Sequence, residues 1–190
     1  MRLRTSFTAL ICTAAVAIAG CGARAASSND AHPGSLSVAA ATLTPAEYAG
    51  ATPTGTPLYA RLASSSAVGD TGQALTATLA GTTYRSATGV WIGCEGTAAA
   101  AVYRLGGEFA KLTGVLGLQP HTPRALRVRV LVIVDGATKL ATTLARDDAP
   151  QTVSIPLDGA RSVTVSALAT GGECAPAPAP YGAIGAASLT

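Results

Sequence analysis

Few residues of this chain have the types and the spacing that catalysis requires. The two histidines, His32 and His121, have no acidic or nucleophilic partner close by in the sequence. Asp147 and Asp148 could act as paired catalytic carboxylates or help to hold calcium, but adjacent acidic residues after a strand more often form a solvated turn. The chain has no GxSxG elbow, no phosphate-binding glycine loop and no metal-spaced His and Glu cluster. We therefore expect no enzymatic activity, no cofactor and no metal.

The first twenty residues have the composition of a targeting segment. Two arginines precede an apolar run, Phe7 to Gly20, that is too short for a comfortable membrane span. The run ends in IAGC at residues 18–21, which resembles the lipobox of bacterial lipoproteins. The resemblance implies a signal peptide over residues 1–20, a lipid on Cys21, and attachment to the extracytoplasmic face of the cell membrane. The alternative is a plain secretory signal with an incidental Cys21.

Cysteine usage agrees with export from the cytoplasm. Of the four cysteines, Cys12 lies in the segment to be removed and Cys21 would carry the lipid. Two thiols in an oxidising compartment predict one bridge, here between Cys94 and Cys174, which closes a loop of about 80 residues. Two buried free thiols are the alternative. A metal site is disfavoured because two cysteines without nearby histidines are too few ligands.

The clearest strand of the chain covers residues 126–134, where valines alternate with two arginines. Leu131 and Ile133 make its far half apolar on both faces, which predicts a central strand covered on both sides. Asp135 and Gly136 tolerate the positive φ of a tight turn, so a hairpin should follow.

The region after residue 66 has the same pattern of short strand-like runs, separated by Gly, Asp or Pro. That pattern is typical of an all-β sandwich or jelly roll, which we expect over residues 67–190. Residues 21–66 are rich in Ala, Ser, Thr and Pro without an apolar period, which predicts a flexible tether. The expected strands are Leu75–Leu79, Thr82–Arg85, Val90–Cys94, Ala100–Leu105, Phe109–Leu118, Leu126–Val134, Lys139–Leu144, Thr152–Leu157, Ser162–Ala167 and Ile184–Leu189.

Composition excludes some partners. The formal charge of +3 includes the two arginines of the first four residues, which leaves +1 for the exported part, and no long basic run occurs. We therefore expect no nucleic-acid partner. Aromatic residues make up only 4% of the chain, so any ring-lined binding surface should be small.

Four motifs follow one another in the predicted domain: LAG at 79–81, YRLGG at 103–107 with GVLGL at 114–118, the Asp-Gly turn at 135–136, and the final strand at 185–189. Their order and spacing resemble the NPCBM family, the novel putative carbohydrate-binding modules. The resemblance covers roughly residues 73–190. It implies a jelly roll of the galactose-binding-like type and a carbohydrate ligand.

The chain departs from that family in its loops. Members that bind sugar usually carry a glycine and a histidine-alanine segment ahead of the tyrosine run, where this chain has GVWIGC at 89–94. QPHTP at 119–123 stands where the family commonly has an Asp pair. Residues 175–180 alternate Ala and Pro, whereas the family is often acidic and aromatic there.

Residues in or beside the predicted loops supply the rings and charges that a sugar site needs, because a ring face packs on the sugar and charged groups satisfy its hydroxyls. The candidates are Arg85, Trp91, Glu95 and Tyr181, expected at the end of the sandwich near the Cys94–Cys174 bridge. Trp91 could instead be a core or half-buried strand residue, Arg85 could be an ordinary solvated strand residue, and Tyr181 is open to either exposure or burial.

Two functions remain open from the sequence. The first is a lipid-anchored binding module of the bacterial cell envelope whose ligand is a glycan with a galactose-like sugar. The second is a structural or adaptor lipoprotein that contacts another envelope protein. The shortage of aromatic residues and the missing family histidine favour the second.

Overall fold

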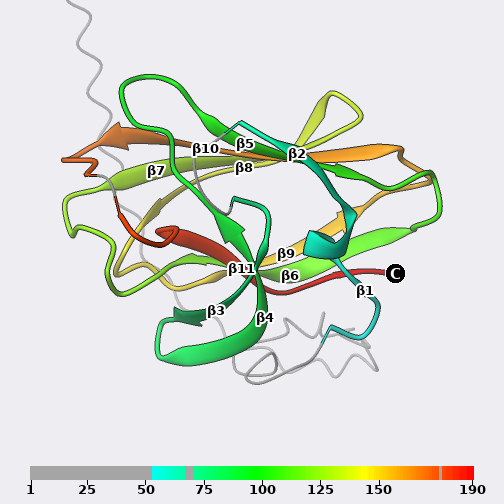
Figure 1. The fold of residues 1–190 in the computed structure, drawn as a ribbon, viewed down its shortest axis with the longest axis horizontal. Helices are drawn as coiled ribbons and strands as arrows, with labels where there is room; N and C mark the ends of the chain where they lie inside the picture. The colour runs from blue at the N-terminus through cyan, green and yellow to red at the C-terminus, as the bar shows by residue number, and fades with distance from the viewer. Residues whose placement is uncertain (1–52, 67–70, 176) are drawn as a thin grey trace, which may run out of the picture. The chain divides into compact units, whose positions relative to one another are not determined.

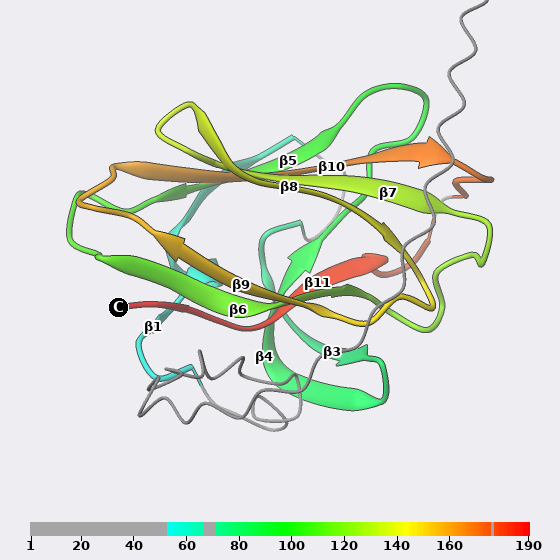
Figure 2. The same ribbon diagram turned by 180° about the vertical axis from the view of Figure 1, so that it is seen from behind.

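Strands make up nearly all of the regular structure. The computed structural model describes residues 53–66, 71–175 and 177–190, and the statements below concern these residues. Within them the strands form two antiparallel sheets that face each other (Figure 1, Figure 2). The expected β-sandwich is therefore confirmed.

Each sheet joins strands that are far apart in the sequence. Sheet A contains, in spatial order, β3 (Ala74–Leu79), β4 (Thr82–Val90), β11 (Gly182–Leu189), β6 (Lys111–Leu118) and β9 (Gln151–Pro156), with β1 (Thr56–Pro57) paired to β11. Sheet B contains β2 (Leu62–Ser65), β5 (Ala99–Arg104), β10 (Ser162–Gly171), β7 (Arg127–Val134) and β8 (Ala137–Ala145). A 3₁₀ turn, η2 (Leu58–Arg61), separates β1 from β2.

The main core fills the space between the two sheets. Val128, Val130, Val132 and Val134 are buried on one face of β7, as the alternation predicts. On the other face Leu131 and Ile133 are only half-buried. The strand is therefore internal in its sheet, but the expectation that it is covered on both sides was wrong.

A second, smaller cluster lies around Tyr84, where the β3–β4 hairpin packs against β6 and β11. Gly185 makes room for the Tyr84 ring, because a Cβ atom at this position would lie 2.6 Å from the ring carbon Cγ. Leu79 likewise lies over Gly117. Glycines in β6 and β11 thus allow the hairpin to approach the sheet closely.

The domain begins earlier than the predicted boundary at residue 67. Thr56 pairs with Leu189 in sheet A, and β2 pairs with β5 in sheet B. Leu58, between these two edge strands, is fully buried. Leu62, at the start of β2, also packs against the core, and Pro57 is tolerated in an edge strand. This part of the expected tether therefore belongs to the sandwich.

The chain between residues 82 and 94 also differs from the prediction. The structure has one strand, β4, where two were expected, and the chain leaves the sheet after Val90. Gly93 then forms an isolated bridge with Leu168 of β10. A side chain at Gly93 would collide with the carbonyl oxygen of Thr97, so glycine is required for this path.

The hairpin after β7 is confirmed. Asp135 and Gly136 both have positive φ, 44° and 83°, as a two-residue turn of this kind requires. The Asp135 carboxylate accepts hydrogen bonds from the backbone N–H of Arg161 (3.0 Å) and of Ser162 (2.8 Å). Hydrogen bonds to the charged carboxylate hold the pKa of Asp135 below its ordinary value. The bond from the backbone N–H of Arg161 has the largest effect, and the bond from the Ser162 hydroxyl the next largest.

The described part of the chain contains no helix of the length and apolarity needed to span a bilayer. The predicted signal peptide and Cys21 lie outside the described residues.

Candidate functional site

Four loops gather at one end of the sandwich because the strands that precede them all finish there. In sheet A, Val90 and Leu118 both lie opposite Gly182, so β4 and β6 end where β11 begins. In sheet B, Gly171 and Ala145 both lie opposite Arg127, so β10 and β8 end where β7 begins. We call these connections, residues 91–98, 119–126, 146–150 and 172–181, the loop end (Figure 1).

A disulfide joins two of these loops. Cys94 and Cys174 are bonded, with their Cα atoms 5.8 Å apart, and the predicted bridge is confirmed. The loop of residues 91–98 is also tied to β10 by two backbone hydrogen bonds. The N–H of Gly93 donates to the carbonyl oxygen of Ala167 (3.0 Å), and the N–H of Ala169 donates to that of Gly93 (2.8 Å). The 91–98 loop is therefore held to both sheets.

Three of the four predicted sugar-binding residues lie at the loop end. Trp91 directly follows Val90, and Tyr181 directly precedes Gly182. Because Val90 and Gly182 are paired, both candidates lie at this end of sheet A. Trp91 is half-buried, and in the described residues its indole nitrogen is buried without a hydrogen-bond partner. Glu95 is exposed next to the bridge, in a left-handed turn with φ of 59°.

The fourth candidate is placed differently. Arg85 is exposed on β4, five residues before Val90, which corresponds to about 16 Å along an extended strand. Among the described residues no hydrogen bond or ion pair connects its side chain to the other three candidates. The structure thus groups Trp91, Glu95 and Tyr181 but not Arg85.

Tyr181 is buried and anchors its surroundings. Its hydroxyl donates a hydrogen bond of 2.9 Å to the carbonyl oxygen of Ala175, just after the disulfide. Its ring packs against the ring of His121, with centroids 5.4 Å apart and planes inclined by 37°. His121 itself is exposed, so it presents a flat ring to solvent on this support.

The loop that carries His121 is held firmly. The Gln119 side chain donates to the carbonyl oxygen of Pro180 (2.6 Å), and the Thr122 hydroxyl donates to that of Tyr181 (3.2 Å). Both Gln119 and Thr122 are buried. Buried, satisfied polar groups of this kind fix a loop in one conformation.

A hollow of about 460 Å³ lies beside this loop. Leu118, Pro120 and Ala80 form its apolar wall, and Arg146, Asp147 and Asp148 form its polar wall. Arg146 and Asp147 are joined by an ion pair of 3.0 Å, which lowers the pKa of Asp147 through the hydrogen bond that Arg146 donates. The hollow therefore offers a hydrogen-bond donor and an acceptor next to apolar atoms.

Asp148 stabilises the turn that forms the polar wall of this hollow. Its carboxylate accepts a hydrogen bond of 2.7 Å from the backbone N–H of Ala145, which closes the turn after β8. Sequence reasoning treated Asp147 and Asp148 as a solvated turn, and it set His121 aside. Asp147 and Asp148 are indeed exposed. Together with Arg146 they nevertheless form one side of a hollow, because Leu118 and Pro120 lie on its other side.

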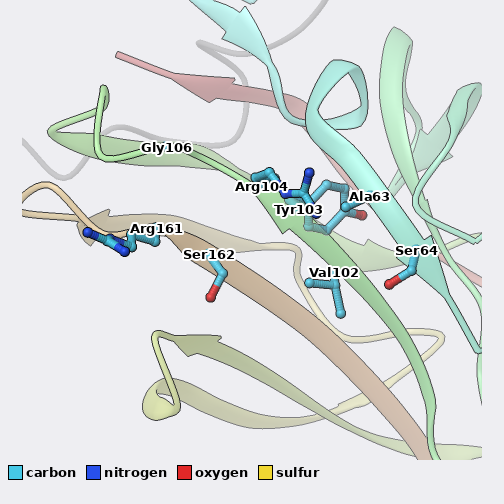
Figure 3. A pocket seen from close by; sticks show the side chains of 8 residues that line it. All are labelled: Ala63, Ser64, Val102, Tyr103, Arg104, Gly106, Arg161 and Ser162. Carbon is cyan, nitrogen blue, oxygen red and sulfur yellow. The ribbon is translucent and has the colours of Figure 1, made fainter.

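A larger hollow, of about 660 Å³, lies away from the loop end on sheet B (Figure 3). Its walls carry Arg104 and Arg161, and no acidic residue lines it. Within the described ranges, no group of three His, Cys, Asp or Glu residues is arranged to hold a metal ion.

Comparison with known proteins identifies the kind of domain. The NPCBM/NEW2 domain family matches residues 46–176. Among solved structures, the chain is similar to CBM51 from Clostridium perfringens GH95 in complex with methyl-galactose, with a TM-score of 0.53 and 18% identity over 71% of this chain and 99% of that one. No curated protein matches the chain.

The chain is also similar to a second solved structure, the M60 catalytic domain with the CBM51-1 and CBM51-2 domains from Clostridium perfringens ZmpB. The TM-score is 0.52 and the identity is 19% over 67% of this chain. The match spans only 14% of that longer structure. At these identities both likenesses show a shared β-sandwich fold.

Proposed function

Because the chain belongs to the NPCBM/NEW2 domain family, we propose that it is a carbohydrate-binding module that holds a galactose-like sugar at the loop end. The observation that carries this proposal is the hollow in which the Arg146–Asp147 pair faces Leu118 and Pro120. The methyl-galactose bound by the similar CBM51 structure makes a galactoside the first ligand to test. The proposed role is binding without catalysis.

The chemistry of the hollow suits a neutral sugar. Sugar hydroxyls need both donors and acceptors, and each one left unpaired on binding costs about 1 to 3 kcal/mol. Arg146 supplies donors and Asp147 supplies acceptors, while the apolar wall can cover the less polar face of the ring. Because Gln119 and Thr122 already hold the adjacent loop, little further ordering is required when the ligand binds.

Calorimetry of the full chain with methyl galactoside tests the proposal. Asp147→Ala and Arg146→Ala should each weaken binding about tenfold or more, since each removes a charged hydrogen-bonding group. Lys139→Ala is the matched control, because it removes an exposed charge near the opposite end of β8 and should bind as the wild type does. Circular dichroism checks folding.

Unchanged affinity in both hollow variants would move the site away from Arg146 and Asp147. Trp91, Glu95 and Tyr181 are then the remaining candidates at this end, and Trp91→Ala and Glu95→Ala test them in the same assay. If the full chain bound no glycan on a broad array, the carbohydrate role would fail. The alternative of an adaptor that contacts an envelope protein would then be preferred.

We also propose that the chain is anchored by lipid on Cys21 to the extracytoplasmic face of the bacterial cell membrane. The support is the IAGC segment at residues 18–21. A diacylated anchor buries many methylene groups, each contributing about 0.8 kcal/mol. Cys21→Ser should leave the membrane fraction, whereas Cys12→Ser, in the segment to be removed, should stay in it. A Cys21→Ser protein that still sedimented with membranes after a high-salt wash would contradict this anchor.

A further inference from the structure

The hollow of about 660 Å³ lies across three neighbouring strands of sheet B. Ser64 of β2 pairs with Val102 of β5, and Ser162 of β10 pairs with Arg104 of β5. Because paired residues point to the same face, these side chains all lie on one side of the sheet. Figure 3 shows Val102 between Ser64 and Ser162, with Arg104 and Arg161 toward one end.

This hollow is separate from the loop end. Ser162 starts β10, and Leu168, which forms a bridge with Gly93 near the disulfide, lies six residues later in the same strand. Six residues of extended chain correspond to about 20 Å. A monosaccharide bound in one place therefore does not touch the residues of the other.

Both arginines of the hollow are free to bind an anion. Arg104 and Arg161 are exposed, and the ion pairs found in the described structure involve Arg61 and Arg146 instead. Asp135 lies nearby, and the charge of Arg161 contributes to its lowered pKa, but among the described residues the two side chains form no ion pair and the carboxylate already accepts hydrogen bonds from the backbone of Arg161 and from Ser162. The walls of the hollow therefore carry two positive charges that no carboxylate within ion-pair distance neutralises.

A smaller hollow of about 400 Å³ continues from the first one and shares Ala63, Arg104 and Gly106 with it. There Arg61 forms an ion pair of 2.9 Å with Glu108, and its guanidinium lies 4.9 Å from the centre of the Phe109 ring. We call the two hollows together the arginine furrow. Arg104 lies where they meet, so a ligand longer than one sugar unit can contact it from either side.

We propose that the arginine furrow is a second binding site, for an acidic saccharide chain that carries carboxylate or sulfate groups. A guanidinium presents two parallel N–H groups that match the oxygens of either anion. The Ser64 hydroxyl can bond a sugar hydroxyl, the Ser162 hydroxyl, which already donates to Asp135, can accept a hydrogen bond from one, and Val102 gives an apolar floor for a ring. This proposal does not rest on the loop-end site, since it concerns different residues and a charged ligand.

Binding of the full chain to polygalacturonate and to dextran sulfate, with neutral dextran as reference, tests this site. The wild type should bind at least one of the acidic polymers and not dextran, and the affinity should fall as salt is added. Arg104→Gln/Arg161→Gln should weaken binding by about tenfold or more, because two charge-assisted contacts are lost. The carboxylated and the sulfated polymer together show which anion the furrow prefers.

A charge-matched control separates the site from general attraction. Arg129→Gln/Lys139→Gln removes the same number of positive charges from exposed positions on β7 and β8, outside the furrow. It should retain wild-type affinity for the acidic polymer. An equal loss in both double variants, or no binding of either acidic polymer by the wild type, would overturn the proposal. Binding of methyl galactoside should be unaltered in Arg104→Gln/Arg161→Gln, which keeps the two sites distinguishable.

Discussion

The hydroxyl of Tyr181 donates a 2.9 Å hydrogen bond to the carbonyl oxygen of Ala175, so the loop before β11 is closed both by this bond and by the disulfide next to it. Tyr181→Phe removes this bond alone and should lower the free energy of unfolding by about 1 kcal/mol. Urea unfolding followed by circular dichroism measures it. Tyr59→Phe, at a half-buried position in η2, should change stability by less than about 0.5 kcal/mol. Equal losses in the two variants would show that the Ala175 bond contributes nothing specific.

The Cys94–Cys174 bridge should contribute more than any single hydrogen bond. The cysteines are 80 residues apart, and removing a native bridge of this kind typically costs about 2 to 5 kcal/mol. Cys94→Ser/Cys174→Ser should therefore unfold at a lower urea concentration, and it should bind galactoside more weakly because two loops of the loop end are released. A non-reduced digest analysed by mass spectrometry should contain the linked peptide. Recovery of both cysteines as alkylated thiols from the native protein would exclude the bridge.

Gly185 should not tolerate a side chain. A Cβ atom there would lie 2.6 Å from Cγ of Tyr84, so the ring or the strand must shift, and overpacking of this kind costs about 1 to 3 kcal/mol. Gly171→Ala is the comparison, because a Cβ at that position meets its nearest atom, in Arg127, at an ordinary 3.8 Å. Thermal unfolding should therefore show a lower midpoint for Gly185→Ala than for Gly171→Ala. Equal midpoints would mean that the hairpin does not pack on β11 as described.

Asp135 should make stability depend on pH in the acid range. Its pKa is lowered because the N–H of Arg161 and the hydroxyl of Ser162 bind the charged carboxylate. A carboxyl group with a lowered pKa stabilises the fold at pH values above its ordinary pKa of about 4, and this contribution is lost as the pH falls through the folded-state pKa. Asp135→Asn should be less stable than the wild type at neutral pH, and the difference should shrink below about pH 4. A difference that did not change with pH would contradict the charged interaction.

The sandwich could be predicted from the sequence because its strands have strong local signals. The valines of β7 alternate, and Asp135-Gly136 supplies the turn residues that the hairpin requires. The first two strands could not be predicted in this way. They are four residues or fewer, and the segment contacts the core through the buried Leu58 and the half-buried Leu62, in a region whose composition is that of a tether.

The candidate site could be predicted only in part. The cysteine count pointed to the bridge, and the bridge pointed to the end of the sandwich where Trp91 and Tyr181 lie. The hollow formed by Arg146 and Asp147 was missed, because an acidic pair after a strand has no local feature that distinguishes it from a solvated turn. Its other wall comes from Leu118 and Pro120, and only the folded arrangement of the two sheets brings these segments together.

The most direct test of the central claim is an NMR titration of the isotope-labelled chain with methyl galactoside. Amide signals of residues 118, 119, 121, 122 and 146–148 should shift and saturate, while those of Val102, Arg104 and Ser162 in the arginine furrow should stay in place. Trp91 is the only tryptophan, so its single indole signal shows in the same spectra whether that ring takes part. Shifts confined to residues outside the loop end, or no shift at sugar concentrations on the order of 10 mM, would contradict a galactoside site there.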